Sequence, residues 1–437
     1  MTTTVFDTNT VIGSGVVWTS AAVGDSALVL ESVTAISTAT AGFVVDNSEV
    51  EVQVFGLLAS TFGNALFFDN GDDSTVYIGQ TGTVSSALSY FGSAGIYAES
   101  DDVDIVNDGT IVGGSGIYIN GDSSYIENTG TIRTTSDEDN DLSLAVAGIS
   151  LGAASAVGTA TSHTVINYGL ISGLEYSIIN TNGNFRNGNS SANIENHGTL
   201  QGAVELGDLN DRLINTGTIN GTVDLGGGSD TYIGRGDSSV SHAVTGGNGN
   251  DHLAGGTGDD TLIGGNGNDT VRGADGDDML SSLNGNASMH GGRGDDTLDG
   301  GSGNDTLLGG RDNDMLIGNG GNDLMLGHAG NDTLDGGAGR DTIEGGVGTD
   351  VITGGTAADI FVFKGNFGND TITDFNSISA GEKIDLSGVG AIADFADLAA
   401  NHMTQSGTSV IIDAGRGNTI TVERTDISNM DAGDFLF

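Results

Sequence analysis

The stretch that decides the fold runs from Gly246 to Val362. It opens GGNGNDHLA GGTGDDTLI GGNGNDTVR (246–272) and closes GGVGTDVIT GGTAADIFV (345–362), and its nine-residue frame holds throughout. The eighth position of every unit is apolar. The residues there are Leu253, Leu262, Val271, Leu280, Met289, Leu298, Leu307, Leu316, Met325, Leu334, Ile343, Ile352 and Phe361. A short repeat kept in one frame predicts a solenoid, because each unit buries its apolar side chain by stacking on its neighbours.

The sixth position is an aspartate in every unit except 282–290, where Ala287 replaces it. These aspartates are Asp251, Asp260, Asp269, Asp278, Asp296, Asp305, Asp314, Asp323, Asp332, Asp341, Asp350 and Asp359. We expect glycines at the first, second and fourth positions to permit backbone conformations closed to other residues and to let carbonyl groups crowd together. A carboxylate among carbonyls makes an all-oxygen environment, which suits a hard cation with six to eight oxygen ligands.

The last three residues of each unit predict a short strand whose middle side chain points inward, because side chains alternate along a strand. Two units then make one coil, so that loops two units apart stack along the same edge. One edge carries Asp251, Asp269, Asp305, Asp323, Asp341 and Asp359, and the other carries Asp260, Asp278, Asp296, Asp314, Asp332 and Asp350. Without a metal ion, carboxylates stacked in this way repel one another strongly.

This pattern resembles the RTX (repeats-in-toxin) nonapeptide. The resemblance implies a parallel β-roll in which each Ca²⁺ lies between two loops, with the twelve aspartates as ligands. Units that depart from the motif are expected to bind calcium weakly or not at all. These are 282–290, 309–317 with Asp312 at the fourth position, 318–326, and 354–362 with Ala357 at the fourth position. The alternative, a flexible Gly/Asp-rich linker, would keep neither the frame nor the apolar position.

The composition limits the possible partners. The chain has 59 acidic and 12 basic residues and a formal net charge of −47, which repels nucleic acid and anionic membranes and attracts divalent cations. No cysteine is present, so no disulfide can form. No apolar stretch is long enough to insert into a membrane, and the opening residues MTTTVFDTNTVIGSG do not form a secretory signal peptide.

A looser repeat occupies residues 41–233. Its anchor is an apolar pair followed by Asn-x-Gly-x-apolar, as in IVNDGTI (105–111) and IENTGTI (126–132). Another short apolar strand precedes most anchors, which indicates a right-handed parallel β-helix. We expect Asn to adopt left-handed conformations at the corners and its side chains to form a hydrogen-bonded ladder.

The predicted fold is therefore all-β: a right-handed parallel β-helix that continues into an RTX calcium β-roll, followed by a β-rich cap. The domain boundaries that we predict are 1–40 for N-terminal strands or a cap, 41–233 for the β-helix, 234–245 for a transition, 246–362 for the roll and 363–437 for the C-terminal cap. Because the two repeats blend near residue 230, one continuous rod is expected.

The segment 363–437 resembles the C-terminal region that follows RTX repeats in serralysin-type proteases and other type I secretion substrates. Within it, DFADLAANHM (394–403) predicts a short helix. The final Asp434–Phe437 places an acid before apolar residues, similar to the uncleaved signal of type I ABC exporters. The alternative is a buried final strand. We therefore expect leaderless type I export to the cell surface or the medium, where calcium would fold the repeats.

No catalytic residue is predicted, because the chain contains neither HExxH nor GxSxG. The favoured function is structural or adhesive, in a surface layer, extracellular matrix or filament, with self-assembly or a cell-surface polysaccharide as the possible partner. The enzymatic alternative is a polysaccharide epimerase or lyase. Its candidate acid–base residues are Tyr118, Tyr125, Tyr168, Tyr176 and His197, and its candidate carboxylate-binding residues are Arg133, Arg186 and Arg212. A threonine array for ice binding is a third alternative, comprising Thr261, Thr270, Thr297, Thr306, Thr333 and Thr342.

Overall fold

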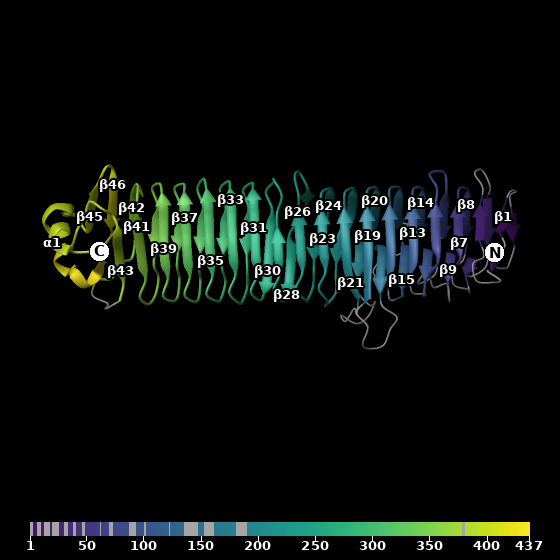
Figure 1. The fold of residues 1–437 in the computed structure, drawn as a ribbon, viewed down its shortest axis with the longest axis horizontal. Coiled ribbons are helices and arrows are strands. Elements are labelled where there is room, and N and C mark those ends of the chain that lie inside the picture. Colours follow the sequence, from purple (N-terminus) through teal and green to yellow (C-terminus); the bar gives the residue numbers. More distant parts are fainter. Residues whose placement is uncertain are drawn as a thin grey trace. The chain divides into compact units, whose positions relative to one another are not determined.

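The computed structural model of the chain forms two compact units, Met1–Val244 and Thr245–Phe437. Each is built almost entirely of short parallel strands (Figure 1). The residues that the structure describes are 3–6, 10–12, 18–19, 26–29, 34–37, 41–45, 49–61, 63–69, 73–86, 93–99, 102–121, 123–134, 147–152, 161–180, 190–377 and 381–437. Among them, no helix is long and apolar enough to cross a membrane. The acidic segment SDEDND (136–141) lies outside the described residues.

The first unit is a parallel β-helix with up to three strands per coil. The first stack consists of β1 (Thr3–Phe6), β4 (Ser26–Val29), β7 (Glu51–Val54), β10 (Thr75–Ile78), β13 (Val103–Asn107), β16 (Ser124–Asn128), β19 (Thr161–Asn167), β21 (Ser190–Asn196), β23 (Arg212–Asn215) and β26 (Thr231–Gly234). The second consists of β2 (Thr10–Ile12), β5 (Thr34–Ser37), β8 (Leu57–Ser60), β11 (Thr83–Ser86), β14 (Thr110–Gly113), β17 (Thr131–Thr134), β20 (Leu170–Asn180), β22 (Thr199–Glu205), β24 (Thr218–Asn220) and β27 (Ser239–Val240).

The third stack begins as separate strands and later merges with the second. Its members are β3 (Trp18–Thr19), β6 (Ala41–Val45), β9 (Asn64–Phe68), β12 (Ala94–Ala98), β15 (Ser115–Asn120), β18 (Ala147–Gly152), the second halves of β20 and β22, and β25 (Val223–Asp224). The strand β28 (Val244–Asn248) follows in the chain.

Alternating side chains explain how these strands close a core. In β13, Val103 and Ile105 are buried while Asp104 is exposed. In-register strands place like side chains above one another, and each member of the row at Ile105 is fully buried. That row consists of Ile105, Ile126, Val165, Ile194 and Leu213. Hydrophobic burial along such rows is the main stabilising contribution to this unit.

The predicted asparagine ladder is present at the end of the first strand stack. Its members are Asn107, Asn128, Asn167, Asn196 and Asn215, and all are fully buried. Each side-chain N–H group donates to the Oδ1 of the next member, at 2.7 Å for the first pair and 2.8 Å for the other three.

The expectation of left-handed asparagines at these corners is wrong. Among the described residues, those with positive φ include none of the five ladder members. Each asparagine ends a strand. The Oδ1 atoms of Asn107, Asn167 and Asn215 accept from the backbone N–H two residues later, that of Gly109, Gly169 and Gly217, each at 3.2 Å. The side chain, not the backbone conformation, therefore accounts for asparagine at these positions.

The second unit is a two-stranded-per-coil β-roll. One stack consists of β29 (His252–Ala254), β31 (Thr270–Asp275), β33 (Ser288–Arg293), β35 (Thr306–Arg311), β37 (Leu324–Ala329), β39 (Thr342–Val347), β41 (Ile360–Lys364), β43 (Lys383–Gly388) and β47 (Phe435–Leu436). The other consists of β30 (Thr261–Asn266), β32 (Met279–Ser281), β34 (Thr297–Asp299), β36 (Met315–Ile317), β38 (Thr333–Asp335), β40 (Val351–Thr353) and β42 (Asn369–Ile372).

The predicted coil of two nonapeptides is confirmed, because residues in paired strands are 18 apart up to β41. All thirteen eighth-position side chains are fully buried, as the frame predicts. These side chains form the apolar interior of the coils. The buried aspartates lie in the loops between the strands.

The C-terminal segment adds a small mixed structure. It contains α1 (Phe395–Asp397), a π-helical turn (Leu398–His402), β44 (Met403–Ser406), β45 (Ser409–Gly415), β46 (Asn418–Val422) and two 3₁₀ turns (Ile427–Asn429 and Ala432–Asp434). The short helix predicted at 394–403 is therefore confirmed, and the Asp394 side chain caps it by accepting from Asp397 N. β44, β45 and β46 are antiparallel neighbours, and β46 joins β42 in parallel.

Candidate metal centre

The sixth-position aspartates lie in two stacked rows, with the membership that the repeat frame predicts. From Asp269 onward, each Oδ1 accepts a hydrogen bond from the backbone N–H of the residue one coil earlier. Asp305 N donates to Asp323 Oδ1 at 2.8 Å, and Asp323 N donates to Asp341 Oδ1 at 2.8 Å. On the other edge, Asp314 N donates to Asp332 Oδ1 at 2.9 Å. One oxygen of each carboxylate thus fixes the register of adjacent coils.

The second carboxylate oxygen has no hydrogen-bond partner in most of these loops, although it is buried. The Oδ2 atoms concerned belong to Asp278, Asp296, Asp305, Asp314, Asp323, Asp332, Asp341, Asp350, Asp359 and Asp370. Burying an ionised carboxylate oxygen without a partner is costly unless a cation compensates it. These rows of acceptors therefore favour metal ions between the loops.

The first-position glycines leave the space into which Oδ2 projects. A Cβ atom added to Gly318 would lie 2.5 Å from Asp323 Oδ2 and 2.5 Å from the carbonyl oxygen of Gly336. At Gly246, the same distances to Asp251 Oδ2 and the Gly264 carbonyl are 2.5 and 2.6 Å. The expectation that this glycine serves an unusual backbone conformation is wrong. It is needed because carboxylate and carbonyl oxygens approach it closely.

Positive φ angles occur instead at the second and fourth positions, for example at Gly265 (104°) and Gly267 (139°). Five non-glycine residues at these positions also have a positive φ, whereas Leu283 does not. They are Ala274 (96°), Asp312 (73°), Asn319 (67°), His328 (74°) and Ala357 (95°). The loop geometry is thus imposed by the stack even where the motif departs from glycine, at a cost in backbone strain.

The electrostatic state of the rows reflects their burial. Burial, opposed by a backbone hydrogen bond and reinforced by neighbouring carboxylates, raises the pKa of Asp314 to about 8 and that of Asp323 to about 7. Burial likewise raises the pKa of Asp296, Asp305 and Asp332 to about 6. In the absence of a cation, these loops therefore hold protons more strongly than ordinary aspartates do.

The donor set suits calcium. The polar atoms nearest to the first-position glycines are carboxylate and carbonyl oxygens, which is the ligand set that Ca²⁺ prefers. Within the part of the chain that the structure describes, no group of three or more His, Cys, Asp or Glu side chains gathers at one point. Backbone carbonyls must therefore complete the coordination of any ion held there.

The loop of unit 282–290 differs from the others. Ser282 stands at the first position, and its hydroxyl donates to Asp269 Oδ2 and to the Gly265 carbonyl, both at 3.3 Å. The Ala287 N–H donates to Asp305 Oδ1 at 2.7 Å, so the coil register survives without the aspartate. The serine hydroxyl satisfies the oxygen that a metal ion would otherwise contact.

A second ladder at the fifth position was missed in the sequence. The Oδ1 atoms of Asn250, Asn268, Asn286 and Asn304 accept from the backbone N–H of the residue one coil later, at 2.7–2.8 Å. Asp259, Asp277 and Asp295 do the same on the other edge. The side chain of the fifth residue thus accepts from the following coil, and that of the sixth residue accepts from the preceding coil. The recurring Asn or Asp before most sixth-position aspartates was the available signal.

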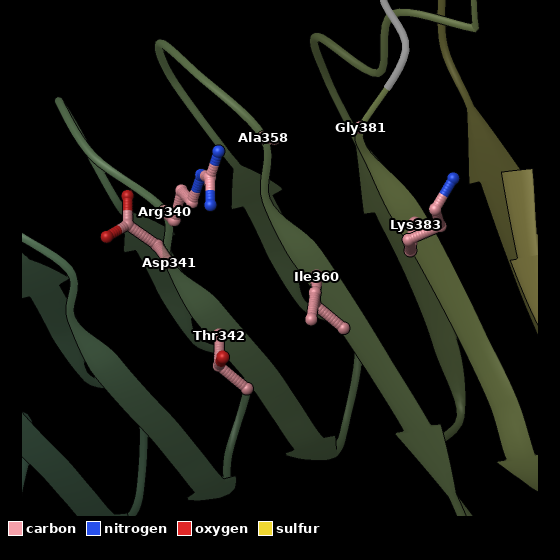
Figure 2. Close-up of a pocket in the computed structure, with 7 residues that line it drawn as sticks. All are labelled: Arg340, Asp341, Thr342, Ala358, Ile360, Gly381 and Lys383. Atoms are coloured by element: carbon pink, nitrogen blue, oxygen red, sulfur yellow. The ribbon is translucent and has the colours of Figure 1, made fainter.

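A hollow of about 360 Å³ lies beside the last coils, between β39, β41 and β43 (Figure 2). It is lined by Arg340, Asp341, Thr342, Ala358, Ile360, Gly381 and Lys383. The small residues Ala358 and Gly381 open it, because they stand where larger side chains would fill the surface. The Lys383 ammonium group is already hydrogen-bonded to the Gly433 carbonyl.

The candidate acid–base residues of the first unit are only partly brought together. Tyr168 and His197 stack with ring centroids 4.8 Å apart, and His197 Nδ1 is 2.7 Å from Thr216 Oγ1. Arg212 forms an ion pair with Glu195 at 3.3 Å and a hydrogen bond with Asn193 at 2.8 Å.

The other candidates lie apart from this pair or have their own partners. Tyr118 stacks on Tyr97 at 4.9 Å, and the Tyr125 hydroxyl donates to Glu127 at 2.9 Å. Tyr176 lies in β20 and Arg133 in β17, while Arg186 lies outside the described residues.

The threonines do not form a continuous array. In the second stack of the roll, Thr261, Thr297 and Thr333 alternate with Met279 and Met315 from coil to coil. Both methionines are about half exposed, so bulky apolar side chains interrupt the threonine row. A flat threonine surface of the kind required by the ice-binding hypothesis is therefore missing from this stack.

Comparison with known families decides the nature of the loops. The family model for the RTX calcium-binding nonapeptide repeat (4 copies) matches residues 245–280, 283–316, 290–325, 317–352 and 326–361. This region is an array of RTX calcium-binding repeats. Multiple Ca²⁺ ions are therefore its cofactors, as the resemblance implied. The RTX match ends before residue 362 and does not extend into the first unit.

Two solved structures show local similarity to the chain. Extracellular lipase LipA from Serratia marcescens is 19% identical, with 48% of this chain and 45% of the lipase covered, at a TM-score of 0.25. The AlgE6R3 subunit of the mannuronan C5-epimerase from Azotobacter vinelandii is 28% identical, with 31% of this chain and 78% of that subunit covered, at a TM-score of 0.15. This chain thus covers less than half of the lipase. No curated protein matches it.

Proposed function

We propose that this protein is a secreted calcium-binding β-solenoid with a structural or adhesive role in a surface layer, an extracellular matrix or a filament. The observation that carries the proposal is the double row of buried Oδ2 atoms without hydrogen-bond partners. Such rows have no use in a metal-free protein, because each unpaired carboxylate destabilises the fold. They suit a chain that folds where calcium is abundant.

The proposed calcium ligands are the twelve sixth-position aspartates, each with carbonyl oxygens of adjacent loops. They are Asp251, Asp260, Asp269, Asp278, Asp296, Asp305, Asp314, Asp323, Asp332, Asp341, Asp350 and Asp359. Two of them have protein partners for Oδ2, since Asp260 Oδ2 accepts from Gly256 N at 2.7 Å and Asp269 Oδ2 accepts from Ser282. Weaker binding is proposed at those two loops.

The calcium concentration that such sites need supports an extracellular location. Extracellular calcium modules have dissociation constants of roughly 10⁻⁴–10⁻³ M, which external fluids reach and cytosol does not. The repeats would stay unfolded inside the cell and fold outside, because the free energy of calcium binding contributes directly to the free energy of folding.

Removal of calcium tests this folding role. The full chain is measured by far-UV circular dichroism in millimolar calcium and again after excess EGTA. We expect loss of much of the strand signal from the roll and its recovery on adding calcium back; magnesium at the same concentration serves as the control. A strand signal that is unchanged in EGTA would contradict the proposal.

The structural role rests on the solenoid form and on the absence of a catalytic motif in the sequence. Its partner would be a second copy of the chain or a cell-surface polysaccharide. Electron microscopy of the purified protein in millimolar calcium, with an EGTA-treated sample as control, tests self-assembly. Ordered arrays or filaments that vanish with EGTA would support it, whereas dispersed particles in calcium would argue against self-assembly.

Export through a type I ABC exporter is proposed from the C-terminal residues. Phe435–Leu436 forms the short strand β47 beside β43, while Leu436 and Phe437 remain about two-fifths exposed. Deleting residues 378–437 in cells that carry a matched exporter should abolish appearance in the medium. Deletion of one internal coil, 291–308, leaves the C-terminus intact and serves as the control. Equal export of the 378–437 deletion and the full chain would exclude the signal.

A polysaccharide-modifying enzyme, an epimerase or lyase, is the second candidate function. The stacked Tyr168 and His197 beside the Glu195–Arg212 ion pair are the specific observation in its favour. Against it, Arg212 is engaged by Glu195 and Asn193, and recognition of a uronate needs a cation. We expect no turnover of alginate or pectate in calcium buffer. Unsaturated uronate absorbance, or new guluronate signals by NMR, would overturn the structural assignment.

A further inference from the structure

A nonapeptide outside the repeat frame follows the last matched unit. Residues 365–373 read GNFGNDTIT, which places Gly365, Gly368, Asp370 and Ile372 at the first, fourth, sixth and eighth positions. Two extra residues after Val362 displace this unit from the preceding frame. The family match ends at residue 361, so this unit is not part of it.

The displaced unit makes the same backbone contacts as its predecessors. Asp350 N donates to Asp370 Oδ1 at 3.0 Å, as Asp332 N donates to Asp350 Oδ1 at 2.9 Å. Gly348 N donates to the Phe367 carbonyl at 3.1 Å, as Gly330 N does to the Val347 carbonyl at 3.0 Å. The spacing between carboxylates is 20 residues instead of 18, and the loop nevertheless keeps its register.

Both carboxylates present an unpaired, buried oxygen. Asp350 is fully buried and Asp370 is 1% exposed, and the Oδ2 atom of each lacks a hydrogen-bond partner. The nearby Asp374 behaves differently, because its two oxygens accept from Gly354 N at 2.9 Å and Gly355 N at 2.8 Å. Asp374 is thus satisfied by the backbone, whereas the Oδ2 atoms of Asp350 and Asp370 accept no backbone hydrogen bond.

The row of carboxylates stops after this loop for an evident reason. β46 continues the stack beyond β42 and places Ile420 in register with Asp370. The Gly368 N–H then donates to Asn418 Oδ1 at 2.9 Å, so a neutral amide closes the edge. Asp370 is therefore the last acidic residue on this edge.

We infer that Asp370 and Asp350 hold a calcium ion between the loops 345–350 and 365–370. This inference deepens the proposed function and rests on it. The site takes one carboxylate from the repeat array and the other from the C-terminal segment. Because β42 also pairs with β46, the ion fastens the C-terminal strands of this unit to its last repeat coil.

The number of bound ions tests the site. The full chain is equilibrated with saturating calcium, dialysed against a defined calcium concentration, and its bound calcium is counted by elemental analysis. Asp370→Asn should bind one ion fewer per chain than the wild type, because the amide keeps the Asp350 N–H bond but loses the charge. Asp374→Asn is the matched control and should bind the full number. Equal far-UV spectra in calcium verify that both variants fold.

A measurement on the wild-type chain avoids reliance on a folded variant. Hydrogen exchange, read by mass spectrometry during a calcium titration, should show residues 365–373 gaining protection together with 345–353. An Asp370→Asn chain that binds as many ions as the wild type would overturn the site, as would exchange in 365–373 that calcium leaves unchanged. A wild-type chain that binds no calcium would instead refute the proposed function itself.

Discussion

The two units place different polar side chains at the buried corners of their coils. Each stacks identical polar residues at a buried corner, asparagine in the β-helix and aspartate in the β-roll. The asparagine ladder is complete within the protein, because each amide has both a donor and an acceptor and pairs with its own copy one coil away. An ionised aspartate has acceptors only. After Oδ1 takes a backbone N–H, Oδ2 remains without a partner.

This difference makes the asparagine corner self-sufficient and leaves the aspartate corner dependent on a cation. Asparagine and aspartate differ by one side-chain atom, nitrogen or oxygen. With nitrogen the side chains satisfy one another by hydrogen bonds, whereas with oxygen a metal ion is needed to compensate the unpaired carboxylate oxygens. The comparison also predicts where calcium acts: on the second unit, and not on the ladder of the first.

Placing a carboxylate in the asparagine ladder should have the largest effect. Asn167 Nδ2 donates to Asn196 Oδ1 at 2.8 Å and to the carbonyls of Gly169 and Thr199, each at 3.3 Å. In Asn167→Asp, an oxygen would face these three acceptors in a fully buried position. We expect the free energy of unfolding of the first unit to fall by about 3–5 kcal/mol, the usual cost of an uncompensated buried charge.

Urea unfolding at pH 7.5, in saturating calcium, measures this change through the transition of the first unit. The exposed Asn220→Asp, whose amide bonds only to Gln201 at the surface, is the matched control and should change stability by less than about 0.5 kcal/mol. Equal losses in the two variants would show that the ladder contributes nothing specific.

Protons should partly replace calcium in the second unit. Folding raises the pKa of Asp278 and Asp323 to about 7, that of Asp314 and Asp370 to about 8, and that of Asp359 to about 6, from an ordinary value of 3.8. The folded metal-free unit therefore binds more protons than the unfolded chain. Its stabilisation by protons is complete below pH 3.8 and is lost as pH rises through about 6–8.

Metal-stripped protein, free of chelator, should therefore gain strand signal as pH falls from 8 to 5. The calcium-loaded protein at pH 8 provides the reference signal for the folded state. A strand signal in the second unit that stays constant, or falls, across this pH range would contradict the assignment of raised pKa values to the rows.

The periodic features of the second unit could be read from the sequence. A fixed nine-residue period determines which side chains point inward and which aspartates share an edge, so the rows from Asp251 to Asp359 and the buried eighth positions followed directly. The period could not predict residues beyond the point where it is interrupted. Asp370 belongs to the same row, but two extra residues shift it out of the nine-residue frame. Its place in the row is evident only from the pairing of Val351 with Thr371 and from the hydrogen bond of Asp350 N to Asp370 Oδ1.

Features that depend on contact between coils could not be derived from the period. Ser282 looked like a missing glycine, yet its hydroxyl contacts Asp269, a residue 13 positions away. The first-position glycines were correctly expected to matter, but their reason is the approach of Oδ2 and a carbonyl. Likewise, the asparagine ladder was foreseen from its spacing, while the backbone conformation of its members depends on the bond to the glycine two residues later.

The smallest expected effect concerns a loop whose backbone is imposed by the stack. Ala357 occupies the fourth position with φ of 95°, where a Cβ atom is unfavourable and glycine is not. Ala357→Gly should relieve roughly 1–2 kcal/mol of backbone strain and lose roughly 0.4–1 kcal/mol through the greater freedom of the unfolded chain. A net stabilisation of about 0.5–1 kcal/mol is expected in urea at fixed, saturating calcium.

The control is Ala338→Gly. Ala338 also lies in an exposed loop but does not have a positive φ, so this variant should be less stable than the wild type or equally stable. If both variants shift the urea midpoint equally, the positive φ at Ala357 does not reduce the stability of the folded state. The idea that stacking of the coils imposes an unfavourable backbone conformation on this loop would then be wrong.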